Sequence, residues 1–174
     1  MAGSFEANAM IEMRVTGIAM DAATRSPIVL LKDSTGRRAL PIYIGEDQAK
    51  AIGSVLNQLV PPRPGTHDLL INLLDGCNMR LEKVVIHSLK DNTFYALLIV
   101  QQGGVVREID ARPSDAIALA LRSNCPIWVM EEVVADASIP VDRDADEAER
   151  RAFRDFVSNV SPSQLIHRSG YGTV

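Results

Sequence analysis

The stretch RLEKVVIHSLKDNTFYALLIVQQGGVVREIDA, residues 80–111, decides the fold class of this chain of 174 residues. It holds three apolar runs rich in β-branched and aromatic side chains, which favour extended strands. The runs are separated by KDN and by GG, and both connectors are typical of tight hairpin turns. We therefore predict three consecutive antiparallel strands, over residues 80–89, 92–101 and 105–111.

The N-terminal part of the chain repeats this pattern. Residues 1–10 are predicted to be a flexible tail, because they show no strand or helix periodicity. Three short apolar runs follow, separated by the turn signals TRSP and DSTG. They predict a second antiparallel meander, with strands at residues 12–21, 26–33 and 37–45.

Helical patterns lie between and after the strands. Apolar residues recur at helical spacing in GEDQAKAIGSVLNQL, which predicts an amphipathic helix over residues 45–59. Thr66 is the expected N-cap of a second, short helix that Gly76 closes. A third helix is predicted from about Pro113 to Ser123, followed by the short strand PIWVM.

Strands outnumber helices and tight turns join them, so the sequence predicts an α+β fold with mainly antiparallel sheet and packed helices. One compact domain is expected over residues 11–141. An acidic linker and a C-terminal helical extension are expected over residues 142–174, with a surface helix in EAERRAFRDFVSNV.

The composition limits the classes of function. A chain that is 47% hydrophobic and 23% charged is ordinary for a globular protein, and its net charge of −4 argues against a strongly basic nucleic-acid binder. Eight acids and two bases lie in residues 131–150, so the remainder is mildly basic, with 14 acids and 16 bases. Only 5% of the residues are aromatic, which argues against base-stacking platforms for single-stranded nucleic acid.

The cysteines and the start of the chain indicate its compartment. Cys77 and Cys125 form no CxxC motif and have no histidine cluster beside them, so a structural zinc site is not expected. Both cysteines are expected to be reduced and buried. The start MAGSFEANAM is no secretory signal, and no window has the roughly 18 apolar residues that span a membrane. We expect a cytoplasmic protein without a membrane partner.

The first polar cluster comprises Asp110, Arg112, Ser114 and Asp115, at the entry to the third predicted helix. Pro113 suits the first helical turn, and Ser114 or Asp115 could cap its exposed amides while Asp110 and Arg112 form an ion pair. The same residues also suit a different use. Carboxylates bind divalent metals, and a helix N-terminus and an arginine both attract phosphate. The sequence leaves both interpretations open.

Two further clusters also stand at predicted helix starts. One contains Arg63, His67 and Asp68 in PPRPGTHDLL, and the other contains Glu46 and Asp47 in IYIGEDQA. The plain interpretation is that acids at these positions complement the helix dipole. If the fold brings two of the three clusters together, they would form a polar cleft.

Four segments carry a family resemblance: PIYIGEDQAKAI, PPRPGTHDLL, VVIHSLKDNTFYALL and EIDARPSDAIALALRSNCPIWV, in this order. Over about residues 11–140 the chain resembles the bifunctional nuclease (BFN) domain family. The resemblance implies an α+β fold, nuclease activity on both DNA and RNA, and association into homo-oligomers. The motif positions that it implies are Glu46, Arg63, His67, Asp68, Asp110, Arg112, Ser114 and Asp115.

Two functional hypotheses follow. In the first, the protein is a nuclease assisted by a divalent metal, Mg²⁺ or Mn²⁺, which Asp110, Asp115 and Glu46 would hold. Asp110 and Asp115 would bind the metal or orient the water, assisted by Glu46 or Asp68. Arg112, Arg63 and Ser114 would bind the phosphate, and His67 would be the general acid or base. In the second, the protein is a non-catalytic oligomeric regulatory or binding module whose polar clusters are helix caps and ion pairs.

Overall fold

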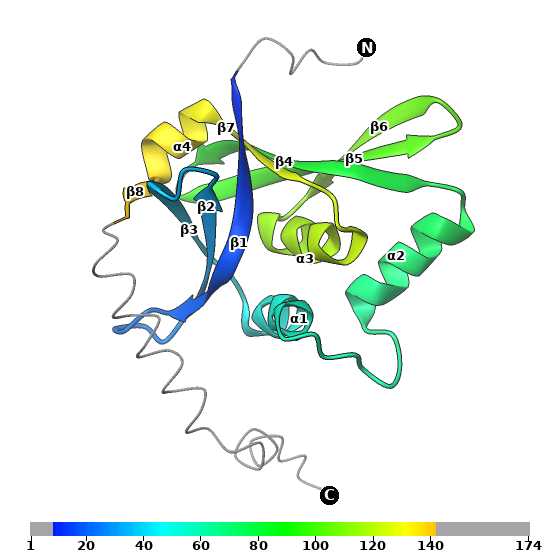
Figure 1. Ribbon diagram of the computed structural model, residues 1–174, viewed down its shortest axis with the longest axis horizontal. Helices are drawn as coiled ribbons and strands as arrows, with labels where there is room; N and C mark the ends of the chain where they lie inside the picture. Colours follow the sequence, from blue (N-terminus) through cyan, green and yellow to red (C-terminus); the bar gives the residue numbers. More distant parts are fainter. Residues whose placement is uncertain (1–8, 142–174) are drawn as a thin grey trace, which may run out of the picture. The chain divides into compact units, whose positions relative to one another are not determined.

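The two predicted groups of strands join into one eight-stranded sheet (Figure 1). The structure is a computed structural model that describes residues 9–141. The predicted tail at residues 1–10 and the helix within residues 147–160 lie wholly or mostly outside these residues. The elements in chain order are β1 (Met10–Met20), β2 (Pro27–Asp33), β3 (Arg38–Tyr43), α1 (Glu46–Leu56), α2 (Thr66–Gly76), β4 (Arg80–Lys90), β5 (Thr93–Gln102), β6 (Val105–Ala111), α3 (Pro113–Ser123), β7 (Ile127–Met130), α4 (Glu131–Ala137) and β8 (Ile139–Pro140).

The sheet has the order β6-β5-β4-β7-β1-β2-β3-β8. All neighbouring strands are antiparallel except β4 and β7, so the predicted α+β fold with mainly antiparallel sheet is confirmed. The short strand β7 joins the two meanders, because it pairs with β4 on one side and with β1 on the other. Its side chains Ile127 and Val129 are buried.

The two hairpin connectors have the predicted turn geometry. Asp91 and Asn92 between β4 and β5 both have positive φ, 48° and 59°, and Gly103 and Gly104 between β5 and β6 have φ of 56° and 84°. Paired positive φ values match the right-handed twist of the flanking strands. The connectors therefore fix the registers of β4, β5 and β6.

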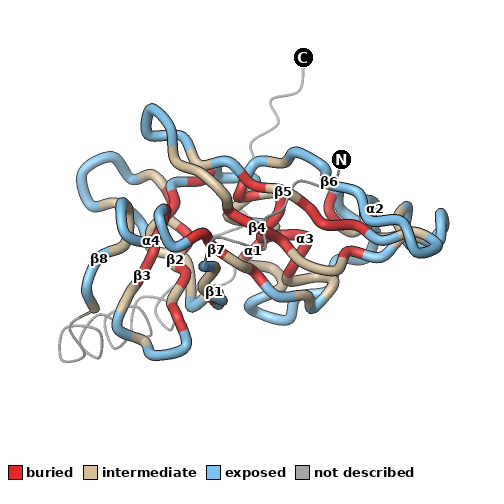
Figure 2. Tube along the Cα trace, turned by 90° about the horizontal axis from the view of Figure 1, so that it is seen from above, coloured by how far each residue is buried: buried red, intermediate tan, exposed pale blue. Residues whose placement is uncertain are grey.

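Helix α3 is the centre of the helical layer. It contacts β4 and β5 as well as α1 and α2, and its residues 116–120 are all buried. Figure 2 shows the buried residues concentrated along the central strands and α3. A helix that is apolar on all sides is stable only when it is surrounded by other elements. The packing of α3 consequently positions the starts of α1 and α2.

Two sequence predictions need correction, and two elements had no prediction. Residues 131–140, for which the sequence analysis predicted no element, form α4 and β8, and the buried Val133 and Val134 anchor α4. Gly65, not Thr66, is the N-cap of α2. Both cysteines are free as expected, but Cys77 is exposed and Cys125 only partly buried.

Candidate active site

A polar network joins the start of α2 to the start of α3. The carboxylate of Asp115, in the first turn of α3, contacts two cationic or polar side chains. Its Oδ1 atom lies 3.0 Å from His67 Nε2, and its Oδ2 atom accepts a hydrogen bond of 2.6 Å from Arg112 Nε. One carboxylate thus holds a histidine and an arginine from two of the predicted polar clusters.

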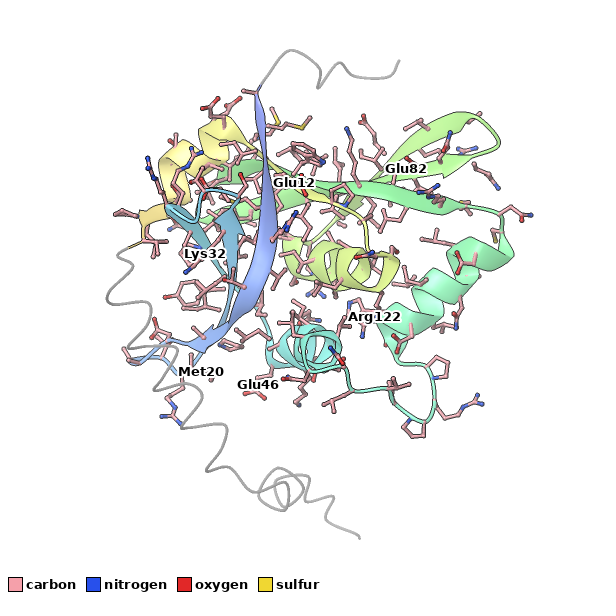
Figure 3. The ribbon with its side chains drawn as sticks, in the orientation of Figure 1. Glu12, Met20, Lys32, Glu46, Glu82 and Arg122 are labelled. Carbon is pink, nitrogen blue, oxygen red and sulfur yellow. The ribbon has the colours of Figure 1, made fainter. Side chains whose placement is uncertain are left out.

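A second ion pair lies beside the first. Arg122, in the last turn of α3, donates from Nε to Asp68 Oδ1 at 2.6 Å. Its NH1 group also donates to the carbonyl oxygens of Ala51 and Ala118, both at 3.0 Å. Figure 3 shows Arg122 at the junction of α3, α1 and α2. Asp68 Oδ2 accepts the amide hydrogen of Gly65 at 2.8 Å, which caps the start of α2.

The spacing of these residues explains the arrangement. Asp115 and Arg122 are seven residues apart, which is about two helical turns, so they share one face of α3. His67 and Asp68 are adjacent at the start of α2 and each contacts one of them. His67 and Asp68 of α2 therefore hold α3 at two points, near its start through Asp115 and near its end through Arg122.

Burial decreases along the network from α2 outward. The exposed fraction of the side chain is 11% for His67, 25% for Asp115 and 68% for Arg112. Burial by itself raises the pKa of the Asp115 carboxyl, but the hydrogen bonds from Arg112 and His67 outweigh it and hold that pKa below its usual range. The carboxylate form of Asp115 is thus favoured.

The pKa of Asp68 is also lowered, chiefly by the hydrogen bond from Arg122 and then by the Gly65 amide. A carboxyl group whose pKa is lower in the folded than in the unfolded chain stabilises the fold above the unfolded value of 3.8. This stabilisation is lost as the pH falls through the lower folded value. The stability that these two carboxylates give to the helix junction therefore depends on pH.

We expect the variant with Asp68→Asn and Asp115→Asn together to be less stable than the wild type at pH 7. The difference should shrink as the pH falls below about 3.8, because the wild-type carboxylates then become protonated as well. Thermal unfolding between pH 7 and pH 2.5 measures this. A difference that stays constant across the range would show that the charges of the two carboxylates do not contribute.

The bond to Asp115 determines which nitrogen of His67 is available. An ionised carboxylate can only accept, so a neutral His67 carries its hydrogen on Nε2 and a lone pair on Nδ1. Among residues 9–141, Nδ1 has no hydrogen-bond partner. His67 lines a cavity of about 310 Å³ together with Arg122 and Lys50. A water molecule in this cavity could reach the ring.

Ser114 does not cap α3. The N-cap is Arg112 and no side chain caps the helix, so the interpretation of Ser114 or Asp115 as a capping residue is wrong. Asp115 instead binds Arg112 and His67. Ser114 is buried and lines a different cavity, of about 430 Å³, together with Arg112.

The other predicted site residues lie outside the network. Asp110 is exposed on β6, opposite Leu97, and its charge acts on His87 of β4. Arg63 is exposed in the loop between α1 and α2, and Glu46 is exposed in the first turn of α1 (Figure 3). Within residues 9–141, none of these three has a hydrogen bond or ion pair with Asp115, His67 or Arg112.

The described carboxylates do not fit the metal site that the sequence predicted. Within residues 9–141, no three His, Cys, Asp or Glu side chains lie together as a metal-binding group. Asp115 uses both of its oxygens for His67 and Arg112, and Asp110 and Glu46 lie elsewhere. Glu46, Asp110 and Asp115 thus form no preformed cage for Mg²⁺ or Mn²⁺ in this part of the chain.

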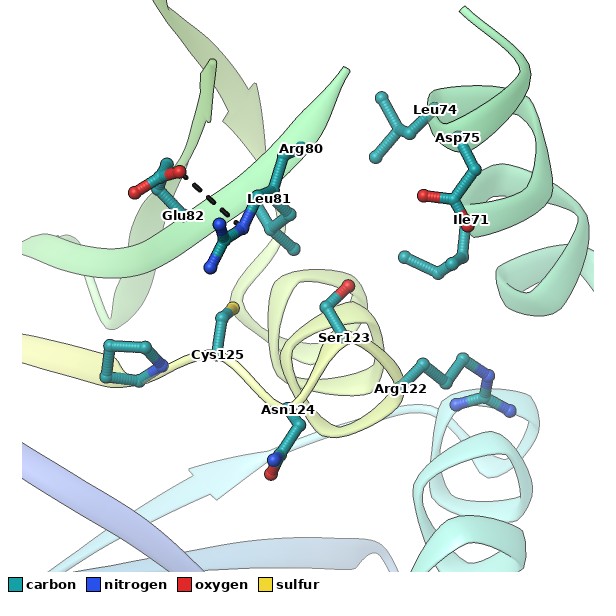
Figure 4. A pocket seen from close by; sticks show the side chains of 11 residues that line it. Ile71, Leu74, Asp75, Arg80, Leu81, Glu82, Arg122, Ser123, Asn124 and Cys125 are labelled. Carbon is teal, nitrogen blue, oxygen red and sulfur yellow. Dashed lines mark ion pairs between the residues drawn. The ribbon is translucent and has the colours of Figure 1, made fainter. Parts of the chain in front are cut away.

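Arg122 is the network residue that the sequence reasoning missed. A signal was present, because a basic residue ends a helix that is otherwise apolar, and it follows Asp115 by two turns on the same face. Arg122 also borders a hollow of about 450 Å³ lined by Asp75 and the Arg80–Glu82 ion pair, but it points away from that hollow toward α1 (Figure 4). Its hydrogen-bond partners Asp68, Ala51 and Ala118 therefore place Arg122 in the helix junction and not in this hollow.

No helix within residues 9–141 combines the length and the apolar character that crossing a membrane would need.

Comparisons with known proteins place the chain in a family. The sequence profile of the bifunctional nuclease domain matches residues 29–142. An uncharacterized protein of Mycobacterium tuberculosis (strain H37Rv) is 38% identical over 164 residues, which cover 90% of this chain and 98% of that protein. Bifunctional nuclease 1 of Oryza sativa subsp. japonica is 25% identical over 124 residues, or 70% of this chain and 38% of the rice protein. The chain thus belongs to the bifunctional nuclease domain family.

Proposed function

We propose that the protein is a nuclease that hydrolyses phosphodiester bonds in DNA and RNA. The observation that carries the proposal is the single carboxylate of Asp115, which holds both His67 and Arg112 by hydrogen bonds. A base at the start of α2 and a cation at the start of α3, both held by one carboxylate, are groups that phosphodiester hydrolysis uses. Membership of the bifunctional nuclease domain family supports the same reaction.

In the proposed reaction, His67 is the general base. Its Nδ1 atom takes a proton from a water molecule while the water oxygen attacks phosphorus. The bond from phosphorus to one sugar oxygen breaks, and that oxygen takes a proton from solvent. The products are a phosphate monoester end and a hydroxyl end. Asp115 positions the imidazole and stabilises the imidazolium that forms.

Arg112 has the second role. Its guanidinium is two-thirds exposed, and Asp115 holds it at the start of α3. A guanidinium at this position stabilises the negative charge that develops on the phosphate oxygens in the transition state. We assign substrate contacts to Ser114 and to the exposed Arg63, and we assign Asp68 a positioning role, since it binds Arg122 and the Gly65 amide.

A divalent cation enters the proposal only as a factor to be tested. Because the described carboxylates form no cage for it, no step above is assigned to a metal ion. Mg²⁺ commonly binds through one or two carboxylates and the substrate's own phosphates. Asp110 and Glu46 are exposed and are candidates for such an auxiliary role.

Cleavage assays test the proposal directly. The purified full chain should cleave single- and double-stranded DNA and RNA, and Arg112→Ala should reduce the rate about a hundredfold through loss of transition-state stabilisation. Arg107→Ala, which removes an exposed arginine of β6, is the matched control and should cleave as the wild type does. Equal cleavage by Arg112→Ala would contradict the assignment. Parallel assays with EDTA measure the dependence on a cation.

The second candidate function is a non-catalytic oligomeric regulatory or binding module. The hydrogen bonds at the helix junction favour it, because Arg122 and Asp68 bind one another and also bind the Gly65 amide and the carbonyl oxygens of Ala51 and Ala118. These polar groups are thus already paired within the fold. Under this alternative, no nucleic acid is cleaved and the network variants lower only the melting temperature.

Assembly, location and domain limits complete the proposal. A homo-oligomer, a dimer or higher, is supported by the exposed apolar side chains Leu69, Leu70 and Leu73 along α2. We further propose a cytoplasmic location, and a nuclease domain over residues 11–141 followed by an acidic linker and a helical extension.

A further inference from the structure

A second cavity, of about 430 Å³, lies where the starts of α1 and α3 meet the tip of the β4–β5 hairpin. Its volume falls within the range of small-molecule pockets, roughly 300–1,000 Å³. Arg112 and Ser114 line it together with Tyr43 and Phe94. The cavity thus combines groups that suit an anion with groups that suit a flat apolar ring.

The start of α3 contributes amide donors without helical acceptors to this cavity. Ala116 is the first residue of α3 whose amide bonds within the helix, to Arg112 O, so the amides of Ser114 and Asp115 have no helical acceptor. Ser114 is only 9% exposed, lines the cavity, and makes no hydrogen bond through its hydroxyl within residues 9–141. Because this oxygen is not among the fully buried unsatisfied atoms of the described residues, it is accessible to a group in the cavity. Together with the Arg112 guanidinium, these donors match a phosphate group.

The N-terminus of helix α1 also borders this cavity, through Gly45 and Gln48. Its N-cap Gly45 has no side-chain cap, and the first amide bonded within the helix is that of Ala49. The side-chain amide of Gln48 folds back so closely that a Cβ atom on Gly45 would lie 2.5 Å from Gln48 Oε1. Gln48 and Asn92 both line the cavity and carry amides that can donate and accept.

The lining also includes an aromatic ring that is exposed yet held in place. Tyr43 is 61% exposed, and its hydroxyl donates to Asp21 Oδ2 at 2.7 Å. Asp21 is itself fixed, since it accepts the backbone amides of Ala23 and Thr24. A ring already held in place loses little conformational freedom when a base stacks on it. The apolar side chains of Phe94, Ile42 and Ile44 also line the cavity.

We propose that this cavity binds one nucleotide unit of the nucleic acid, with the phosphate at Ser114 and Arg112 and the base against Tyr43 and Phe94. The proposal rests on the nuclease function above and specifies its substrate. A base inside a duplex can enter a cavity only after it is unpaired and unstacked, which costs free energy that a single strand does not pay. The preferred substrates are consequently single strands and frayed ends of DNA or RNA. The low aromatic content of the whole chain argued against stacking platforms, but composition cannot show that Tyr43 and Phe94 line the same cavity.

Isothermal titration of the full chain with adenosine 5′-monophosphate, inorganic phosphate and adenosine tests the proposal. Ser114→Ala should weaken binding of the monophosphate and of inorganic phosphate by about tenfold, because a hydrogen bond to a charged group is lost. Tyr43→Leu should weaken binding of the monophosphate and of adenosine by about tenfold and leave phosphate unchanged. Tyr43→Phe keeps the ring but loses its hydrogen bond to Asp21, so it should bind the monophosphate and adenosine less tightly than the wild type but more tightly than Tyr43→Leu, with phosphate unchanged.

Matched controls lie outside the cavity. Ser123→Ala changes a serine at the opposite end of α3, and Tyr95→Leu removes another exposed tyrosine. Both should bind as the wild type does, and a thermal unfolding scan checks that every variant is folded. Absence of monophosphate binding by the wild type, or equal losses from Tyr95→Leu and Tyr43→Leu, would overturn the proposal.

The outcomes also separate this proposal from the nuclease function. Cleavage that depends on Arg112 without nucleotide binding in the cavity would overturn the subsite and leave the nuclease standing. Nucleotide binding that depends on Ser114 and Tyr43 without any cleavage would support the subsite and contradict the nuclease. If both hold, single strands should be cleaved faster than duplexes by the wild type, and Tyr43→Leu should remove that preference.

Discussion

His67→Gln is expected to reduce the rate of phosphodiester cleavage by about a thousandfold, within the range of 10²–10⁴ typical for loss of a general base. The substitution is close to isosteric, and the glutamine amide can still donate to Asp115 Oδ1. It cannot take a proton from water. The loss should therefore appear in kcat, with little change in KM, because the substrate contacts of Arg112 and Ser114 remain.

A second histidine provides the control for this experiment. His87 lies on β4, outside the network, and burial lowers the pKa of its imidazole. His87→Gln should cleave at the wild-type rate. If the two variants cleave equally well, His67 is not the base.

Arg122→Met is expected to lower the free energy of unfolding by about 3 kcal/mol, the low end for breaking a buried ion pair by removing one partner. The Arg122 side chain is 11% exposed and its partner Asp68 27%. The substitution leaves Asp68 without its cationic partner and the carbonyl oxygens of Ala51 and Ala118 without this donor. For a domain of this size the melting temperature should fall by roughly 6–12 °C.

Two further variants show whether the lost ion pair is the cause. The Arg80 side chain is 82% exposed, and its Nε atom lies 3.7 Å from Glu82 Oε1. Arg80→Met should therefore change the free energy of unfolding by less than about 1 kcal/mol. Adding Asp68→Asn to Arg122→Met should restore part of the loss, since the unpaired charge disappears. Equal destabilisation by Arg80→Met and Arg122→Met, measured by denaturant unfolding, would show that Arg122 has no special role.

Local patterns predicted most of the sheet. The strands β4, β5 and β6 agree with the predicted segments to within a residue or two, because β-branched runs and paired turn residues act over a few positions. The same reasoning missed α4, whose two buried valines are too short a pattern to outweigh the acids around them. It also gave Ser114 a capping role, because propensity cannot reveal where a side chain points.

The composition of the three polar clusters was determined by the sequence alone, and so was their position at helix starts. Which residues meet was decided by the tertiary structure. His67 and Asp115 are 48 residues apart in the chain, and Asp68 and Arg122 are 54 apart. These pairs form because the buried faces of α3 pack against β4, β5 and the neighbouring helices, and no pattern of local spacing encodes that packing. Asp110 shows the converse, since the pairing of β6 with β5 places it opposite Leu97 and outside the network, although it precedes Arg112 by only two residues.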